Sequence, residues 1–181
     1  ILASGVGARD IGMGGAYVAH ANDVTAGYWN VAGLNGLVRP EAAYMHAGRF
    51  DGAVAFDYAA VAYPLTPRST VAVSFFRSAV DDIPGTNNAY DPLTGQLNPD
   101  DVTFFSAADN ALFVSSARGV GSSLSLGARA KVVQRGIGDF ASAWGYSLDV
   151  GAQVDLGRFQ VGINLQDAIG MVQSWSVDDA Q

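Results

Sequence analysis

The 181-residue sequence contains no cysteine, so it can form neither a disulfide bond nor a thiolate metal site. Charged residues make up only 15% of the chain, below the roughly 25% of an average soluble domain. No run of about 18 apolar residues occurs, which excludes a transmembrane helix but not a β-barrel, because barrel strands alternate apolar and polar residues. With 10 Lys and Arg against 17 Asp and Glu, the net charge of -7 argues against nucleic acid as a partner.

Residues that would carry catalysis or bind a metal are also scarce. His20 and His46 are the only histidines, and neither has a carboxylate at ligand spacing, so we interpret both as packing or surface residues. No GxSxG or comparable nucleophile motif occurs. The glycine-rich start at Gly5–Asp10 lacks the third glycine of GxGxxG and is not followed by GK[ST]. We therefore expect no enzyme activity, no catalytic residues, no metal and no cofactor.

Glycine, by contrast, is abundant at 22 residues, and three segments near the C-terminal end alternate apolar and polar residues with the period of a β-strand. They span 123–135, 145–155 and 159–166. Their apolar faces consist of Leu124, Leu126, Ala128, Ala130 and Val132, then Tyr146, Leu148, Val150, Ala152 and Val154, then Phe159, Val161, Ile163 and Leu165. These faces carry no Lys or Arg, which would cost roughly 2–4 kcal/mol in the middle of a bilayer. The pattern predicts antiparallel transmembrane strands.

Earlier strands are expected at 41–49, 53–63, 69–80 and about 103–118, where both faces are fairly apolar. Strands with lipid outside and a packed plug inside would have this pattern, and so would buried strands of a soluble β-sandwich. Outer-membrane barrels alternate short turns with long loops. We expect short turns at 64–68, 119–122 and 156–157, long connections at 81–102 and 136–144, and a short outer turn at 50–52.

Residues 5–34 are glycine-rich and not patterned as a strand. We expect a short helix from about Asp23, capped by Asn22 or Asp23 and ended by Gly33. The chain is thus predicted to divide into a plug segment at 1–38 and barrel strands at 39–181. Because no secretory signal is visible at Ile1, we expect one upstream.

This N-terminal segment resembles the signature of the PorV/PorQ family of outer-membrane proteins, relatives of the FadL transporters. The matching positions are Arg9, Gly12, Met13, Gly14, Ala16, Val18, Ala19, Asp23, Ala26, Trp29, Asn30, Ala32, Gly33 and Leu34. DDIPG at 81–85, SLSLGARAKVV at 123–133 and GINLQDAIG ending at 170 are similar to the family's strand sequences in the same order. Val31 departs from the pattern, because the family usually has proline after Trp-Asn.

The resemblance implies an all-β, FadL-like antiparallel barrel of about fourteen strands in the outer membrane of a Gram-negative bacterium, with the N-terminal segment in the lumen. This chain would supply about half of that barrel. Seven strands cannot close a barrel in lipid, so either strands outside these residues or a partner chain complete the sheet, and we favour the former.

Two groups of residues are candidates for holding the plug. The plug motif itself comprises Arg9, Asp10, Gly12, Met13, Gly14, Asp23, Trp29 and Asn30. The polar residues expected to face the lumen are Arg129, Lys131, Asp149, Gln153, Asp155 and Asn164. Inward charges in barrels usually pair with a plug or line water, so we expect the lumen charges to pair with Arg9, Asp10 or Asp23.

Two further patterns concern the surface. The connection 81–102 offers oxygen ligands of the kind calcium prefers, namely Asp81, Asp82, Asn87, Asn88, Asp91, Asp100 and Asp101, but without EF-hand spacing, and a solvated outer loop is the favoured interpretation. The aromatics Phe104, Phe105, Trp144 and Tyr146 lie near predicted strand ends, as the aromatic girdles of barrels do, although core packing is an alternative.

The resemblance implies two possible functions. A PorV-like protein docks exported proteins at the cell surface for a type IX-like secretion system, so its partners are outer-membrane lipid and other membrane or secreted proteins. A FadL-like channel passes a hydrophobic ligand. Docking predicts a long, ordered loop at 81–102, and a channel predicts an apolar pocket beside the plug. We favour docking, because the signature resembles PorV more closely than FadL.

Overall fold

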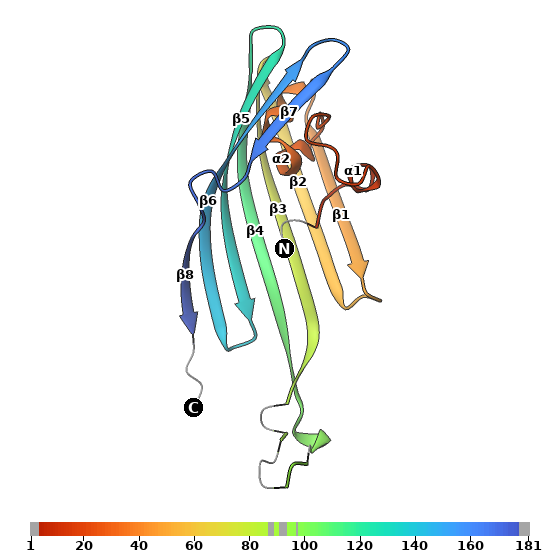
Figure 1. The fold of residues 1–181 in the computed structure, drawn as a ribbon, viewed down its shortest axis with the longest axis vertical. Coiled ribbons are helices and arrows are strands. Elements are labelled where there is room, and N and C mark those ends of the chain that lie inside the picture. The colour runs from red at the N-terminus through yellow and green to blue at the C-terminus, as the bar shows by residue number, and fades with distance from the viewer. Residues whose placement is uncertain (1–3, 87–88, 91–93, 97, 178–181) are drawn as a thin grey trace.

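A single antiparallel β-sheet dominates the computed structural model, which describes residues 4–86, 89–90, 94–96 and 98–177 (Figure 1). The strands are β1 (Glu41–Arg49), β2 (Val54–Thr66), β3 (Ser69–Gly85), β4 (Thr103–Val120), β5 (Leu124–Ile137), β6 (Ala141–Asp155), β7 (Gln160–Leu165) and β8 (Val172–Val177). The helices are α1 (Ala8–Gly12), α2 (Ala26–Trp29) and the 3-10 helices η1 (Val31–Gly36) and η2 (Pro99–Asp101). The predicted all-β class is confirmed.

Each strand from β1 to β6 pairs with the next one along the chain, and the sheet curls into a half-barrel. The short turns β2–β3, β4–β5 and β6–β7 lie at one end of the sheet, which we call the turn end and which is uppermost in Figure 1. The β3–β4 hairpin extends well past the other strands at the opposite end, which we call the hairpin end (Figure 1). Within the described residues, β1 and the β7/β8 pair are the two edges of the sheet.

The last edge is divided between two strands. β7 pairs with Val150–Asp155 of β6, whereas β8 pairs with Ala141–Tyr146 of the same strand. The seventh predicted strand, 159–166, corresponds to β7, but β8 was not predicted. The segment Val172–Val177 reads VQSWSV and lacks strict alternation, so only its pairing with β6 makes it a strand.

Two predicted connections differ from the structure. The predicted long connection at 136–144 is wrong, because β5 and β6 run on to Ile137 and Ala141 and leave a three-residue turn. The 81–102 connection is partly strand, since β3 continues to Gly85 and pairs with β4 from Thr103. A register shift after Val80 accompanies Asp82, which adopts a left-handed φ of 55°.

The sheet has two unlike faces. The outer face carries large apolar side chains that stay exposed, among them Val73, Phe75, Val114, Leu126, Tyr146, Leu148, Val150 and Ile163. In a β-sandwich this face would be buried against a second sheet, and no second sheet covers it in the part of the chain that the structure describes. The inner face is covered at the turn end by residues 5–37, which we call the N-terminal segment.

The hydrophobic core lies between the N-terminal segment and the inner face. Val6, Tyr17, Tyr28, Val31 and Leu34 of the segment are buried. They form one cluster with side chains of the strands, including Tyr58, Ala60, Ala62, Phe76 and Phe113. The ring of Tyr28 lies 6.2 Å from that of Tyr58 and 6.1 Å from that of Phe76. The N-terminal segment therefore supplies half of the only hydrophobic cluster found among the described residues.

Helix boundaries in the segment differ from the prediction. The predicted helix from Asp23 begins at Ala26, and Asp23 accepts the Thr25 N–H through Oδ1 at 2.8 Å just before it. The helix ends at Trp29, so Gly33 does not end it and lies inside η1 instead. A Cβ on Gly33 would lie 2.0 Å from the Ala21 carbonyl oxygen, so this glycine permits close backbone packing.

Candidate functional site

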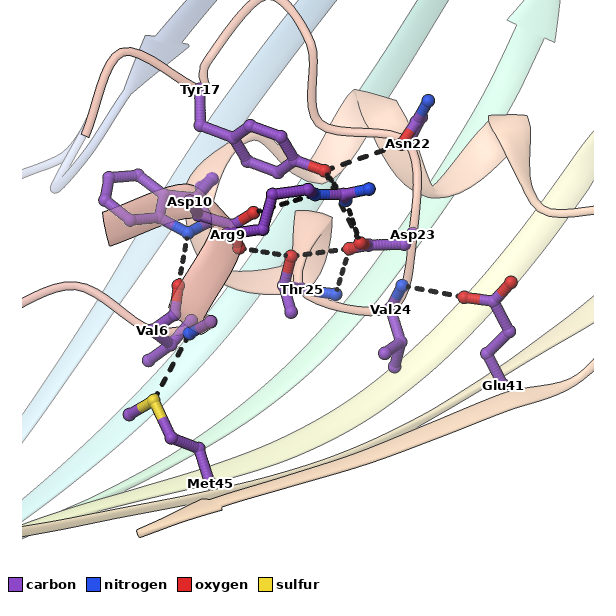
Figure 2. Close-up of polar contacts among 12 residues, drawn as sticks. Val6, Arg9, Asp10, Tyr17, Asn22, Asp23, Val24, Thr25, Glu41 and Met45 are labelled. Atoms are coloured by element: carbon purple, nitrogen blue, oxygen red, sulfur yellow. Dashed lines mark hydrogen bonds and ion pairs between the residues drawn. The ribbon is translucent and has the colours of Figure 1, made fainter. Parts of the chain in front are cut away.

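The N-terminal segment is held in shape by its own charged residues (Figure 2). The Arg9 guanidinium donates to the Tyr17 hydroxyl and forms an ion pair with the Asp23 carboxylate. Burial raises the pKa of Tyr17, and the nearby Asp23 carboxylate raises it further, so this hydroxyl stays protonated at neutral pH. Arg9 thereby joins α1 to the turn that begins α2.

Asp10 is the buried charge of this network and needs a glycine beside it. Its Oδ2 accepts from the Thr25 hydroxyl at 2.9 Å, as Figure 2 shows, and its Oδ1 lies 3.5 Å from Nε of Arg9. Gly7 has a φ of 82°, and a Cβ there would lie 2.2 Å from Asp10 Oδ2. Any other residue at position 7 would therefore displace the carboxylate.

Trp29 and Asn30 fasten the segment at its centre. The Trp29 indole N–H donates to the Val6 carbonyl at 2.9 Å. The Asn30 amide donates to the Val18 carbonyl at 2.8 Å and to the Ala152 carbonyl of β6 at 3.1 Å, while its oxygen accepts the Ala32 N–H. Asn30 thus caps η1 and connects it to the sheet with one side chain.

Three glycines of adjacent strands form the surface on which the segment rests, and we call Gly127, Gly151 and Gly162 the glycine seat. Gly127 of β5 pairs with Gly151 of β6, and Gly162 of β7 lies near them. An added Cβ would lie 2.6 Å from Ala32 N at Gly127, 2.2 Å from Asn30 Oδ1 at Gly151 and 2.5 Å from Ala19 Cα at Gly162. The seat lets the backbone of the segment lie directly on the sheet.

Next to the seat lies a buried charge cluster made of Arg129, Lys131 and Asp149. Arg129 donates from Nε to Asp149 Oδ2 at 2.7 Å, and Lys131 Nζ lies 3.2 Å from Asp149 Oδ1. The same guanidinium donates from Nη1 to the carbonyls of Gly27 at 2.6 Å and Tyr28 at 2.9 Å. Arg129 thereby binds the N-terminal segment through backbone oxygens that helix α2 leaves unpaired.

The cluster also holds the segment between β7 and β8, residues 166–171, which we call the edge crossing. The Asp167 N–H donates to Asp149 Oδ1 at 2.7 Å, and Lys131 Nζ lies 2.7 Å from Asp167 Oδ1. The Ser147 hydroxyl donates to the Gly170 carbonyl at 3.2 Å. Asp149 has no exposed surface. It therefore binds both Arg129, which holds the N-terminal segment, and the backbone of the edge crossing.

Most of the polar residues predicted to face the inside share the inner face: Arg129, Lys131, Asp149, Gln153 and Asn164. Gln153 donates to the carbonyls of Val18 at 3.1 Å and Ala21 at 2.9 Å. Asp155 lies exposed at the strand end and accepts the Gly157 N–H. Asn164 pairs in register with Gly151.

The predicted pairing of these charges with Arg9, Asp10 or Asp23 is wrong. The charges of the segment pair with one another, and those of the sheet pair with one another and with backbone carbonyls. Of the predicted motif, Gly12, Met13 and Gly14 are exposed, and nothing lies within 4 Å of a Cβ built at Gly12 or Gly14. Gly14 has a left-handed φ of 68°, which favours glycine, whereas nothing in the structure explains Gly12 or Met13.

Two cavities open on the inner face toward the hairpin end, on either side of an ion pair between Arg135 and Asp109 (Nε to Oδ1, 2.6 Å). One, of about 420 Å³, is mostly apolar and lined by side chains that include Ser4, Phe56, Val80 and Ile137. The other, of about 290 Å³, lies under the edge crossing and is lined by residues that include Phe76, Val133 and Asp167.

No metal site emerges from the described residues, which contain no group of three His, Asp or Glu side chains close enough to hold an ion. Of the oxygen ligands noted in the 81–102 connection, Asn87, Asn88 and Asp91 lie outside the described residues. Of the four aromatics, Phe105 packs edge-on against Phe140 at 5.2 Å, Phe104 is exposed in the extended hairpin, and Trp144 and Tyr146 are exposed on the outer face of β6.

No family model matches the chain, and neither a curated protein nor a solved structure does. None of the helices among the described residues is long and apolar enough to cross a bilayer.

The glycine seat gives a matched test within β5. Gly127→Ala should lower the melting temperature by several degrees and expose the N-terminal segment to trypsin, because its Cβ would overlap Ala32. Gly136→Ala in the same strand meets nothing closer than 3.7 Å and should leave both properties unchanged. Equal behaviour of the two variants would mean that the close approach at Gly127 is not needed.

Among the charged residues of the sheet, we expect substitution of Asp149 to lower the free energy of unfolding the most. Asp149→Asn leaves Arg129 and Lys131 buried without a full counter-charge and should lower the free energy of unfolding by about 3–5 kcal/mol. The control is Asp155→Asn, an exposed residue of the same strand, which should stay within about 0.5 kcal/mol. Urea unfolding followed by tryptophan fluorescence measures both, and similar losses would contradict the assignment.

Proposed function

We propose that the protein is an outer-membrane β-barrel of the PorV type that docks exported proteins at the cell surface. The observation that carries the proposal is the outer face, which is apolar and exposed across neighbouring strands of the half-barrel. Water would disfavour so large a continuous apolar surface, whereas the hydrocarbon of a bilayer would favour it.

Toward the hairpin end, the apolar surface of the outer face ends at a row of polar side chains. His46, Asp57, Arg77, Asn110 and Gln134 are in register on β1 to β5 and form one row, which we call the polar row. His46 Nδ1 lies 2.8 Å from Asp57 Oδ1, and Asn110 donates to Gln134 at 2.8 Å. Trp144 and Tyr146 lie beside the row, as aromatic residues do at the surface of a membrane.

The apolar band has a suitable width. On β4 the polar row is at Asn110 and the next charged residue toward the turn end is Arg118. Eight residues of strand span about 27 Å, and a strand tilt of about 40° reduces this to about 21 Å across the bilayer. Barrels of the outer membrane have an apolar band of about 25 Å.

In this proposal the N-terminal segment is a plug, and the inner face that holds it is the wall of the lumen. The edges at β1 and at β7/β8 would be unpaired in lipid, which costs several kcal/mol for each unsatisfied backbone group. Further strands must therefore complete the barrel, in agreement with the half-barrel that the PorV resemblance implies.

Docking is favoured by the β3–β4 hairpin. Val80–Gly85 of β3 pairs with Thr103–Ala107 of β4 beyond the polar row, so the hairpin would project from the membrane. It exposes Tyr90 and Phe104, side chains of the type enriched in protein interfaces.

A FadL-like channel is the second candidate, and the two inner cavities favour it. The larger one lies beside the start of the N-terminal segment, at Ser4, and has a mostly apolar lining. A hydrophobic ligand could occupy this space next to the plug.

A charge on the outer face tests the membrane location. Val114→Lys places an ammonium in the middle of the apolar band and should destabilise the protein in vesicles by about 2–4 kcal/mol. Ser106→Lys lies on the same face of β4 beyond the polar row and should be tolerated. The full-length protein should remain in the outer-membrane fraction and migrate faster on a gel when unheated. Solubility without detergent, with Val114→Lys tolerated, would contradict the proposal.

A second pair of variants separates docking from passage. Replacing residues 86–102 by a short turn should abolish co-purification of secreted proteins while leaving the heat-dependent gel migration unchanged. Ile137→Trp fills the larger cavity and should leave co-purification unchanged. If instead Ile137→Trp blocks uptake of a hydrophobic dye and the shortened hairpin has no effect, the channel is the function.

A further inference from the structure

The turn end of the half-barrel is positively charged although the whole chain carries a net charge of -7. Four exposed arginines lie there, on four separate parts of the chain: Arg39, Arg68, Arg118 and Arg158. Arg68 and Arg118 are close neighbours, because Ser69 pairs with Arg118 and the Gly119 N–H donates to the Arg68 carbonyl at 2.9 Å. Among the described residues, none of the four has a carboxylate within 4.0 Å.

The acidic side chains near these arginines accept hydrogen bonds from backbone N–H groups. Glu41 accepts the Val24 N–H at 3.2 Å, as Figure 2 shows, and Asp155 accepts the Gly157 N–H at 2.7 Å. The exposed aspartates gather instead toward the hairpin end: Asp51, Asp81, Asp82, Asp100, Asp101 and Asp139. These six aspartates outnumber the one exposed arginine at the hairpin end, Arg49, so the hairpin end is acidic and the turn end is basic. A surface adapted only to solubility would mix the two signs more evenly.

Exposed apolar side chains accompany the arginines. Val38, Val120, Leu156 and Phe159 lie within two residues of an arginine, and Leu65 lies at the end of β2, three residues before Arg68. An arginine beside apolar surface can lay its methylene stem on hydrocarbon and extend its guanidinium to a phosphate. The turn end therefore offers both apolar side chains for the acyl chains of a phospholipid and guanidinium groups for its phosphate.

The position of the arginines agrees with this chemistry. Arg68 lies in the β2–β3 turn, nine residues before Arg77 of the polar row, and Arg118 lies on β4, eight residues after Asn110. Arg118 is the charged residue that bounds the apolar band on β4, and Arg68 is its neighbour, so both arginines lie at the turn-end limit of the band.

We infer that the turn end binds the phosphate groups of anionic phospholipids through Arg68 and Arg118, supported by Arg39 and Arg158. The inference rests on the proposed membrane location and adds a lipid preference confined to one leaflet. Each arginine near an anionic surface contributes about fivefold in association.

The test uses the full-length protein in vesicles of phosphatidylcholine with increasing brominated phosphatidylglycerol. Phe159→Trp provides a fluorescent reporter at the turn end, in a background carrying Trp144→Phe and Trp175→Phe, and the signal of the remaining Trp29 is subtracted with the background protein. Its quenching should exceed that given by brominated phosphatidylcholine at equal mole fraction. Arg68→Gln with Arg118→Gln should reduce this preference at least about fivefold, whereas Arg68→Lys with Arg118→Lys, which keeps the charge, should retain most of it.

The outcomes separate this inference from the proposed function. If brominated phosphatidylcholine quenches but phosphatidylglycerol is not preferred, or the glutamine variants keep the preference, the lipid site is overturned and the membrane location stands. If neither lipid quenches, the membrane location fails. Loss of the preference on adding inorganic phosphate, with ionic strength matched by chloride, would assign a site for free phosphate instead.

Discussion

The structure depends on one buried carboxylate. Asp149 receives hydrogen bonds from Arg129 and from the backbone of Asp167, and it balances the charge of Lys131. Arg129 in turn holds the carbonyls of Gly27 and Tyr28. Burying these charges costs several kcal/mol for each ion, and only their full set of partners offsets the cost. The N-terminal segment and the edge crossing therefore stabilise each other through a residue that touches water nowhere.

The uncharged contacts around this cluster are possible because the three residues of the glycine seat have no side chain. Gly127, Gly151 and Gly162 leave room for the backbone of the segment, and Asn30 and Gln153 satisfy carbonyls that the approach removes from water. Large residues at the seat would have separated the layers and left those carbonyls buried without donors. Close packing and polar satisfaction are thus two results of the same three glycines.

Sequence reasoning succeeded where the pattern is local and failed where partners are distant. Period-two alternation located β5, β6 and β7 with their faces, since each residue position reports directly on one side of the sheet. It missed β8, whose residues are a strand only because β6 lies beside them, and α1, which is five residues long. It also could not pair the inner charges. That required knowing that Arg129 reaches the end of α2 across more than a hundred residues of chain.

That sequence separation also orders the folding of the molecule. The bonds that hold the N-terminal segment join Arg129 to Gly27, Asn30 to Ala152 and Gln153 to Val18, residues 102, 122 and 135 positions apart. Closing such loops costs entropy that the hairpins, with their neighbouring strands, do not have to overcome. The N-terminal segment is synthesised before the strands that hold it, so it can take its final place only after β6 is complete.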